Sequence, residues 1–443
     1  MNVLDRIARA LLVVLAIAGC ARREQAPIAV EPYLLVWAGD ADRKDPDFLA
    51  VFGGDPSSRK YGQLLKTYPV RPRGNEPQLL NREPRPDGRV FATGVLTGRV
   101  FTFDLARPLA GKLLNTYDPG GKRLLTAPIE PVVLPNGDVA VTCADRMRYR
   151  GAPREVLEAP GGLVALDAAG KFEGEHSGAH PSARSLVVAP YGGAVSRRLG
   201  ILVTTNRGHG FTPTTTGPVQ PGISVQVWSL RDLAVQKTVL LPAGPRGEEN
   251  LGPTLPRFLH RSPMLVVNTH EGGALYASDS LGVAEPAFRL VFDFGAGSLP
   301  SGLVITPDDR FLVVAITGRN RLVALDLTDP WAPKPVSTLR LADGARGGKG
   351  AGPSTLTISA DGARIAVADY TITAASGTLD GDRRVHVVRL DPLTGQLRLD
   401  TDFRGDGEGQ AGVDFGRTTW PHGETGAARP RGLLFIAPVG EDD

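Results

Sequence analysis

The sequence predicts an all-β protein, a single seven-bladed β-propeller, and three observations point to it. First, 54 glycines and 37 prolines make up about a fifth of the 443 residues, too large a share of turn formers for a helical bundle. Second, almost no apolar pattern with the period of an amphipathic helix continues over about twelve residues. Third, one unit recurs along the chain: a tight turn, a strand rich in β-branched residues, a second turn and another strand.

The recurring unit has the chemistry of a β-hairpin. The turn Pro86–Gly88 precedes the apolar stretch 89–92, and the turn Pro135–Gly137 precedes the stretch 138–142. Asp-Gly and Asn-Gly supply the positive φ angles of tight turns, and alternating Val, Ile and Leu fill a half-buried pleat. One four-stranded sheet cannot bury both of its faces, whereas sheets stacked radially around an axis can.

The count of these units predicts the number of blades. Seven units occur, near residues 46–70, 81–118, 131–177, 186–242, 253–295, 300–344 and 352–406. The terminal segments Tyr33–Trp37 and Gly432–Ala437 both have the composition of strands, and we expect them to close the ring together. Rings of six or eight blades are the alternatives.

Residues 1–19 are typical of a bacterial export signal. Arg6 and Arg9 give this segment a positively charged start, and Ala10–Ala18 is an unbroken apolar run. That run is about half of the roughly 20 residues needed to span a bilayer, so it indicates a cleaved signal rather than a membrane anchor.

The end of this segment predicts a lipid anchor. Ile17–Cys20 resembles the lipobox, at which a peptidase cuts before the Cys and the Cys thiol carries a diacylglycerol. We therefore predict a lipoprotein signal peptide over 1–19, lipidated Cys20 with a tether over 20–31, and the propeller over 32–443. Acyl chains on one residue give stable membrane attachment. Residue 21 is Ala rather than Asp, which favours the outer membrane, facing the periplasm, in a host with two membranes. An ordinary signal peptide with a coincidental Cys is the alternative.

Charge and cysteine content narrow the function. The chain has 50 basic and 47 acidic residues, and no Lys/Arg run is longer than two, so we expect no nucleic-acid partner. Only two cysteines occur, and with Cys20 lipidated no intramolecular disulfide can form. Cys143 lies in an apolar stretch, and we expect it to be a buried strand residue rather than a reactive thiol.

Several segments along the chain carry a resemblance to a known family: Asp47–Phe52, Asp55–Ser58, Tyr61–Gln63, Pro256–His260, Asp308–Leu312, Asp326–Pro330 and Val413–Gly416. They resemble the selenium-binding protein family, which includes copper-dependent methanethiol oxidases. These segments occur in the family's order along nearly all of the mature chain. The resemblance implies a propeller with histidines that face the pore and hold copper.

The histidine pattern of that family is broken in this chain. Where the family has an acidic residue followed closely by His-His, this chain has Glu76 followed by Gln78 and Leu79. The stretch 126–131, which matches the family's second His pair, contains no His. A C-terminal family His falls near His422 or Arg431. Copper needs several imidazole or thiolate donors, so we predict no metal and no other cofactor, except under the alternative of an oxidase, and the sequence identifies no catalytic residue.

The resulting hypothesis is a membrane-anchored propeller that binds a small ligand or an envelope protein in its central channel. The alternative is a metal-dependent oxidase of small sulfur compounds, in which surviving histidines and a carboxylate rebuild a copper site. A purely structural lipoprotein that docks other proteins is the third hypothesis. The candidate channel residues are Glu76, Gln78, His209, Arg257, His260, His270, His422, Glu424 and Arg431.

Overall fold

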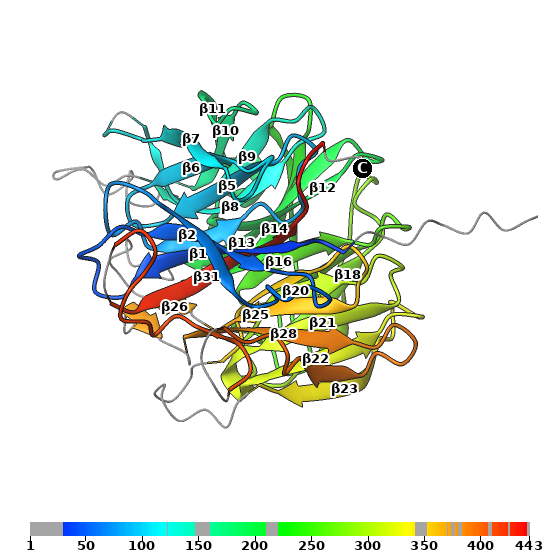
Figure 1. The fold of residues 1–443 in the computed structure, drawn as a ribbon. Coiled ribbons are helices and arrows are strands. Elements are labelled where there is room, and N and C mark those ends of the chain that lie inside the picture. The colour runs from blue at the N-terminus through cyan, green and yellow to red at the C-terminus, as the bar shows by residue number, and fades with distance from the viewer. Residues whose placement is uncertain are drawn as a thin grey trace, which may run out of the picture.

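Seven β-sheets are arranged around a central axis in the computed structural model (Figure 1). The structure describes residues 30–121, 123–146, 160–209, 220–341, 352–369, 371–373, 377–379, 383–405, 410–423 and 426–440. Within these ranges the only helices are two short 3₁₀ turns, Pro181–Ala183 and Thr317–Arg319. No helix in the same ranges has the length and apolar character to cross a membrane. The predicted all-β, seven-bladed propeller is confirmed.

Five blades are each built from four consecutive antiparallel strands. They are β4 (Pro77–Leu80), β5 (Arg89–Gly94), β6 (Arg99–Asp104) and β7 (Lys112–Tyr117); β8 (Leu125–Val133), β9 (Val139–Arg146), β10 (Gly162–Leu166) and β11 (Phe172–Ser177); β12 (Pro190–Ser196), β13 (Ile201–His209), β14 (Gln220–Ser229) and β15 (Val235–Leu240); β16 (Pro253–Phe258), β17 (Leu265–Thr269), β18 (Ala274–Ser278) and β19 (Arg289–Asp293); and β20 (Pro300–Ile305), β21 (Phe311–Ile316), β22 (Arg321–Asp326) and β23 (Lys334–Arg340).

The blade that follows them carries an additional strand and a small hairpin. Its sheet contains β24 (Thr355–Ile358), β25 (Arg364–Ala368), β28 (Arg384–Leu390) and β29 (Leu397–Leu399), and β30 (Val413–Asp414) also pairs with β28. The hairpin of β26 (Thr371–Thr373) and β27 (Gly377–Leu379) separates β25 from β28 along the chain.

The remaining blade joins the two ends of the chain. It contains β1 (Tyr33–Asp40), β2 (Phe48–Gly53) and β3 (Leu64–Pro69), and its innermost strand is β31 (Ala428–Ile436). β31 pairs antiparallel with β1, so that Leu34 lies opposite Phe435 and Val36 opposite Leu433. The predicted closure of the ring by its terminal strands is confirmed. Glu31, at the end of the predicted tether, is buried and already packed against the propeller.

The inner strands β4, β8, β12, β16, β20, β24 and β31 surround the axis, and each contacts the next around the ring. Each of them begins at or contains a proline or, in the case of β24, begins two residues after one: Pro77, Pro128, Pro190, Pro253, Pro300, Pro353 and Pro430. In all but β24 the pairing register shifts just after that proline. Proline has no N–H to donate to the ladder, so a bulge at this point is expected.

The propeller core is mostly aliphatic, as the low aromatic content requires. Side chains from neighbouring sheets interlock in clusters such as the one that contains Val203, Val227 and Tyr276. Cys143 is 2% exposed, which confirms the prediction of a buried strand cysteine, and burial raises the pKa of its thiol.

Candidate ligand-binding cavity

A cavity of about 860 Å³ lies within the ring of inner strands. This volume is in the range of pockets that hold small molecules. The lining extends along the inner strands, from the prolines described above to the turns that follow these strands, where Arg198, Arg261 and Ala360 lie. We call the side of the propeller with these turns the turn end, and the opposite side the proline end.

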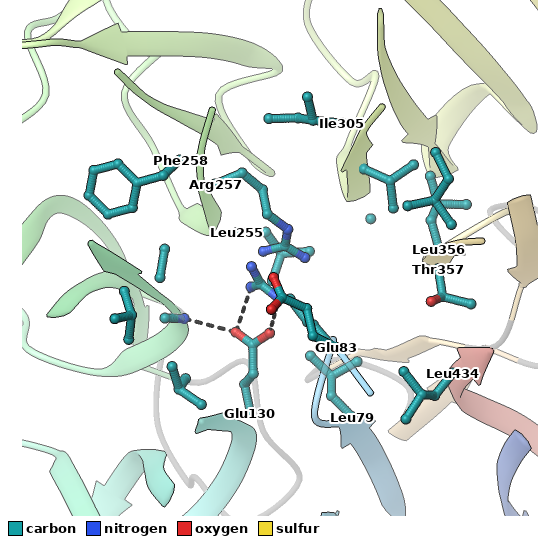
Figure 2. Close-up of a pocket in the computed structure, with 18 of the residues that line it drawn as sticks. Leu79, Glu83, Glu130, Leu255, Arg257, Phe258, Ile305, Leu356, Thr357 and Leu434 are labelled. Carbon is teal, nitrogen blue, oxygen red and sulfur yellow. Dashed lines mark hydrogen bonds and ion pairs between the residues drawn. The ribbon is translucent and has the colours of Figure 1, made fainter. Parts of the chain in front are cut away.

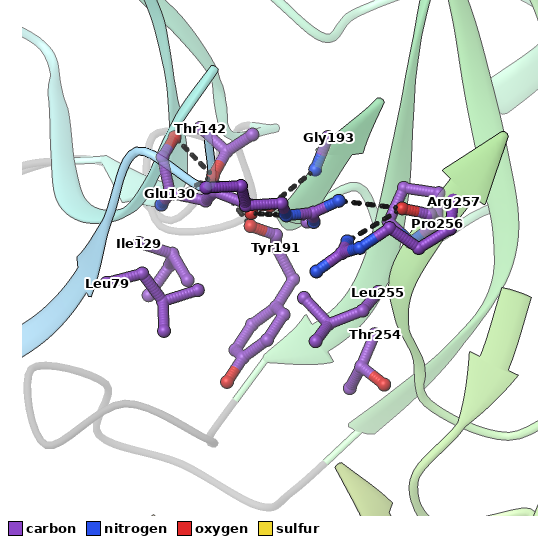
Figure 3. A network of polar contacts seen from close by, with 12 residues as sticks. Leu79, Ile129, Glu130, Thr142, Tyr191, Gly193, Thr254, Leu255, Pro256 and Arg257 are labelled. Atoms are coloured by element: carbon purple, nitrogen blue, oxygen red, sulfur yellow. Dashed lines mark hydrogen bonds and ion pairs between the residues drawn. The ribbon is translucent and has the colours of Figure 1, made fainter. Parts of the chain in front are cut away.

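An ion pair between two blades fixes one wall of the cavity. Arg82, just after β4, donates from Nη2 to Glu130 Oε2 of β8 at 2.7 Å and also donates from Nε to Oε1. Arg82 Nη1 donates to the Pro256 carbonyl of β16 at 3.0 Å. Gly193 N–H of β12 donates to Glu130 Oε2 at 2.8 Å. Figure 3 shows Glu130 between Thr142 and Gly193, with Pro256 and Arg257 across the network.

Glu130 needs these hydrogen-bond partners because its carboxylate is buried. Its side chain is 1% exposed, whereas that of Arg82 is 23% exposed. Burial raises the pKa of the Glu130 carboxyl, and the Arg82 guanidinium opposes that rise. The pair therefore carries little net charge into the cavity, and both partners are kept in fixed positions.

Arg257, near the end of β16, differs from Arg82 because it forms no ion pair with a described residue. Its Nη1 donates to the Pro256 carbonyl at 2.8 Å, and none of the described carboxylates lies within ion-pair distance of it. Figure 2 shows its side chain reaching from the strand into the middle of the cavity. A guanidinium has five N–H donors, so most of the donors of Arg257 are available to a ligand.

A second polar group lies at the proline end of the lining. Arg207 Nη2 is 3.1 Å from Glu271 Oε1, and its guanidinium carbon is 5.1 Å from the ring centroid of Tyr191. Arg431 donates from Nη1 to Ser354 Oγ at 2.7 Å. These contacts fix both guanidinium groups beside the cavity, and Glu271 offsets the charge of Arg207.

His270 lies next to those two arginines. Its Nδ1 is 3.1 Å from the Pro300 carbonyl and 3.1 Å from Ser301 Oγ, and because a carbonyl only accepts, Nδ1 carries the proton. Burial, followed by the charge of Arg207, lowers the pKa of His270 to about 4. The imidazole is therefore neutral at pH 7.

The other walls of the cavity are aliphatic. Five side chains from five inner strands contribute to them: Leu79, Leu255, Ile305, Leu356 and Leu434 (Figure 2). The cavity thus combines the guanidinium of Arg257, which reaches into its middle, with a broad apolar lining.

Four of the candidate residues predicted from the sequence line this cavity: Arg257, His260, His270 and Arg431. His260 lies at the turn end, where its Nδ1 is 2.8 Å from Asp309 Oδ1. Arg257, His260 and His270 all come from the blade of β16–β19, and only Arg431, on β31, is brought to them from a part of the chain far away in sequence.

Four other candidates do not line the cavity. Gln78 is buried in β4, and Glu76 is buried and paired with Arg43. His209 ends β13. His422 packs on the Phe48 ring at 4.8 Å between centroids. Two further residues, the predicted channel residue Glu424 and the predicted lipidation site Cys20, lie outside the described residues.

Sequence reasoning missed Arg82, Glu130 and Arg207. A signal for Glu130 was present, namely the proline that recurs at each inner strand, which Glu130 follows by two residues. The residues directly after these prolines occupy equivalent positions in the seven blades, and we call them the inner ring: Gln78, Ile129, Tyr191, Thr254, Ser301, Ser354 and Arg431.

The residues at these positions do not fit a copper site. The inner ring holds amide, hydroxyl, aliphatic and guanidinium groups, none of which is the imidazole or thiolate donor that copper prefers in proteins. Across the part of the chain that the structure describes, no three His, Cys, Asp or Glu side chains group closely enough to hold a metal ion.

Comparison with known proteins supports the architecture. No family model and no curated protein matches the chain. A solved structure of a hypothetical selenium-binding protein from Sulfolobus tokodaii is 17% identical, covers 92% of this chain and 94% of its own, and has a TM-score of 0.71. A periplasmic gluconolactonase from Pseudomonas aeruginosa is 15% identical over 91% of this chain and 99% of its own, with a TM-score of 0.60. At these identities the likeness is one of fold.

Proposed function

We propose that this protein is a lipoprotein of the bacterial cell envelope, anchored through Cys20, whose central cavity binds a small acidic ligand. The observation that carries the proposal is the Arg257 guanidinium, which reaches into the cavity without a carboxylate partner among the described residues. Seven arginines line the cavity, against three glutamates, and two of the seven, Arg82 and Arg207, are paired with Glu130 and Glu271. Two of the three glutamates are neutralised, Glu130 by Arg82 and Glu31 by Arg364.

The ion pair beside Arg257 explains how its charge stays available. Glu130 is the buried carboxylate of this network, and Arg82 and the Gly193 N–H already occupy its oxygens. The Glu130 oxygens are therefore not available to form an ion pair with Arg257. A carboxylate, sulfonate or phosphate can receive two parallel N–H donors from such a guanidinium, which gives both affinity and orientation.

Replacing Arg257 is expected to remove most of the affinity for anions. The test titrates benzenesulfonate into the full-length protein in lipid nanodiscs by calorimetry, with empty nanodiscs as the blank. We expect Arg257→Met to weaken binding by roughly tenfold to a hundredfold, the loss typical of a charge-assisted hydrogen bond.

Arg231→Met is the matched control, because the Arg231 side chain is 90% exposed on the outer surface. It should bind benzenesulfonate as the wild type does. Equal affinities for wild type and Arg257→Met, or no binding to the wild type, would refute an acidic ligand in this cavity.

Metal analysis separates this proposal from the alternative, a metal-dependent oxidase of small sulfur compounds. After copper loading and dialysis we expect no stoichiometric copper and no oxidation of methanethiol, because the inner ring offers no imidazole. Gln78→His with Leu79→His should still hold copper weakly, since the stretch 126–131 also lacks His. One tightly bound copper with methanethiol turnover in the native protein would favour the oxidase.

A further inference from the structure

The position at which the chain enters the propeller indicates where the ligand comes from. Glu31 lines the cavity at the turn end. Its Oε2 accepts from Arg364 Nη2 at 2.9 Å, and its Oε1 accepts from the N–H of Ala360, in the turn after β24, at 2.6 Å. The first described residues are thus fixed at the mouth of the cavity.

The length of chain before Glu31 limits how far this mouth can lie from a membrane. Ten residues lie between Cys20 and Glu31, and the eleven steps of a fully extended chain from one to the other reach at most about 40 Å. An anchor on Cys20 would therefore be joined to the propeller at its turn end, within about 40 Å of the cavity mouth.

The surface around the mouth suits an anionic bilayer. Arg197, Arg198 and Arg261 line this end and are exposed. None of the three has a described carboxylate within ion-pair distance. Exposed arginines close to a membrane are attracted by acidic head groups. Glu83 shares the rim, and Asp308 and Asp309 lie beside Arg261 and offset its charge, which leaves Arg197 and Arg198 as the positive part of the rim.

The interior suits a molecule with an aliphatic part. Leu255, Ile305, Leu356 and Leu434 are each at most 8% exposed and line the cavity together with Leu79. Such a wall gains little from a wholly polar anion, whereas each methylene buried against it adds to the affinity. The guanidinium of Arg257 reaches into the same space.

We infer that the cavity opens toward the membrane that carries the anchor and takes from it an amphipathic molecule, with one acidic head group and an aliphatic chain. This inference rests on the proposed function, because it keeps Arg257 as the partner of the acid. It adds the apolar wall as the partner of the chain and the bilayer as the source.

Chain length is the first test. In the nanodisc titration, butyrate, hexanoate and octanoate should bind with affinity rising about fourfold per methylene, because the added carbons are buried. Leu356→Asp should abolish this rise, whereas Leu356→Met should retain it. If benzenesulfonate binds through Arg257 but the three acids bind equally, the proposed function stands and this inference fails. If no anion binds, both fail.

Orientation on the membrane is the second test. A single dye is placed at the turn end through Arg198→Cys, or at the proline end through Arg319→Cys in the β21–β22 turn, where the side chain is also exposed. Cys143 is buried and will not be labelled. In vesicles of phosphatidylcholine with phosphatidylglycerol and a nitroxide-labelled lipid, we expect strong quenching at position 198 and weak quenching at 319. Equal quenching, or the reverse order, would overturn a mouth that faces the bilayer.

Discussion

Ending the chain before β31 is expected to destroy the cooperative folding of the propeller. Removing residues 428–443 deletes the innermost strand of the blade that contains β1–β3 and exposes the edge of β1. Leu433, Leu434, Phe435 and Ile436 are each at most 5% exposed, and burial of such a side chain contributes about 1.5–3 kcal/mol. Their combined loss is comparable with the whole stability of a typical domain.

The measurement is thermal unfolding followed by calorimetry and circular dichroism. We expect the truncated protein to show no sharp transition and to expose an open sheet edge that promotes aggregation. A control that ends after Pro438 keeps β31 and loses one backbone hydrogen bond, from Val439 to Ala106, so it should melt close to the full-length protein. A truncation before β31 that melts like the full-length protein would contradict closure by this strand.

Breaking the Arg82–Glu130 pair has the second largest expected effect. Glu130→Ala leaves the Arg82 guanidinium beside apolar side chains and removes the acceptor of the Gly193 N–H. Removing one partner of a buried ion pair costs about 3–5 kcal/mol. Because Arg82 is 23% exposed, water relieves part of this cost, and we expect a loss near about 3 kcal/mol in the free energy of unfolding.

Chemical denaturation of three variants measures this loss. Glu130→Gln keeps an acceptor for the Gly193 N–H and should lose less than Glu130→Ala. The double variant Arg82→Met with Glu130→Leu should recover much of the stability, because neither charge remains to be desolvated. A surface substitution usually changes the free energy of unfolding by at most about 0.5 kcal/mol. If Glu130→Ala changes it by no more than that, the ion pair does not stabilise the fold.

The candidate site was predictable only in part. Arg257, His260, His270 and Arg431 were proposed because they lie at strand ends or in segments that resemble a known family. The cavity itself, and the roles of Arg82 and Glu130, depend on contacts between blades. Arg82 meets Glu130 across 48 residues and Pro256 across 174 residues, and no spacing in the sequence encodes such distances.

Some sequence candidates were placed elsewhere for reasons of local packing. Glu76 turns away from the axis to pair with Arg43, and His422 contacts Phe48 and Thr67 Oγ1 instead of the cavity. A residue that follows an inner-strand proline is also not certain to line the cavity. The bulge at the proline changes the direction of successive side chains. Leu79 therefore lines the cavity, whereas Gln78 is buried and does not line it.

The sequence by itself determined the all-β class, the seven blades and the closure by terminal strands, because these follow from turn chemistry and from strand periodicity that every blade repeats locally. The lipid anchor on Cys20 also comes from the sequence alone and stays a prediction. Only the tertiary structure decided which charges are neutralised and which face the cavity. The reason is that Arg82 is neutralised by a carboxylate from the next blade, while Arg257 has none within reach, and that difference arises only when the ring brings β4, β8 and β16 together.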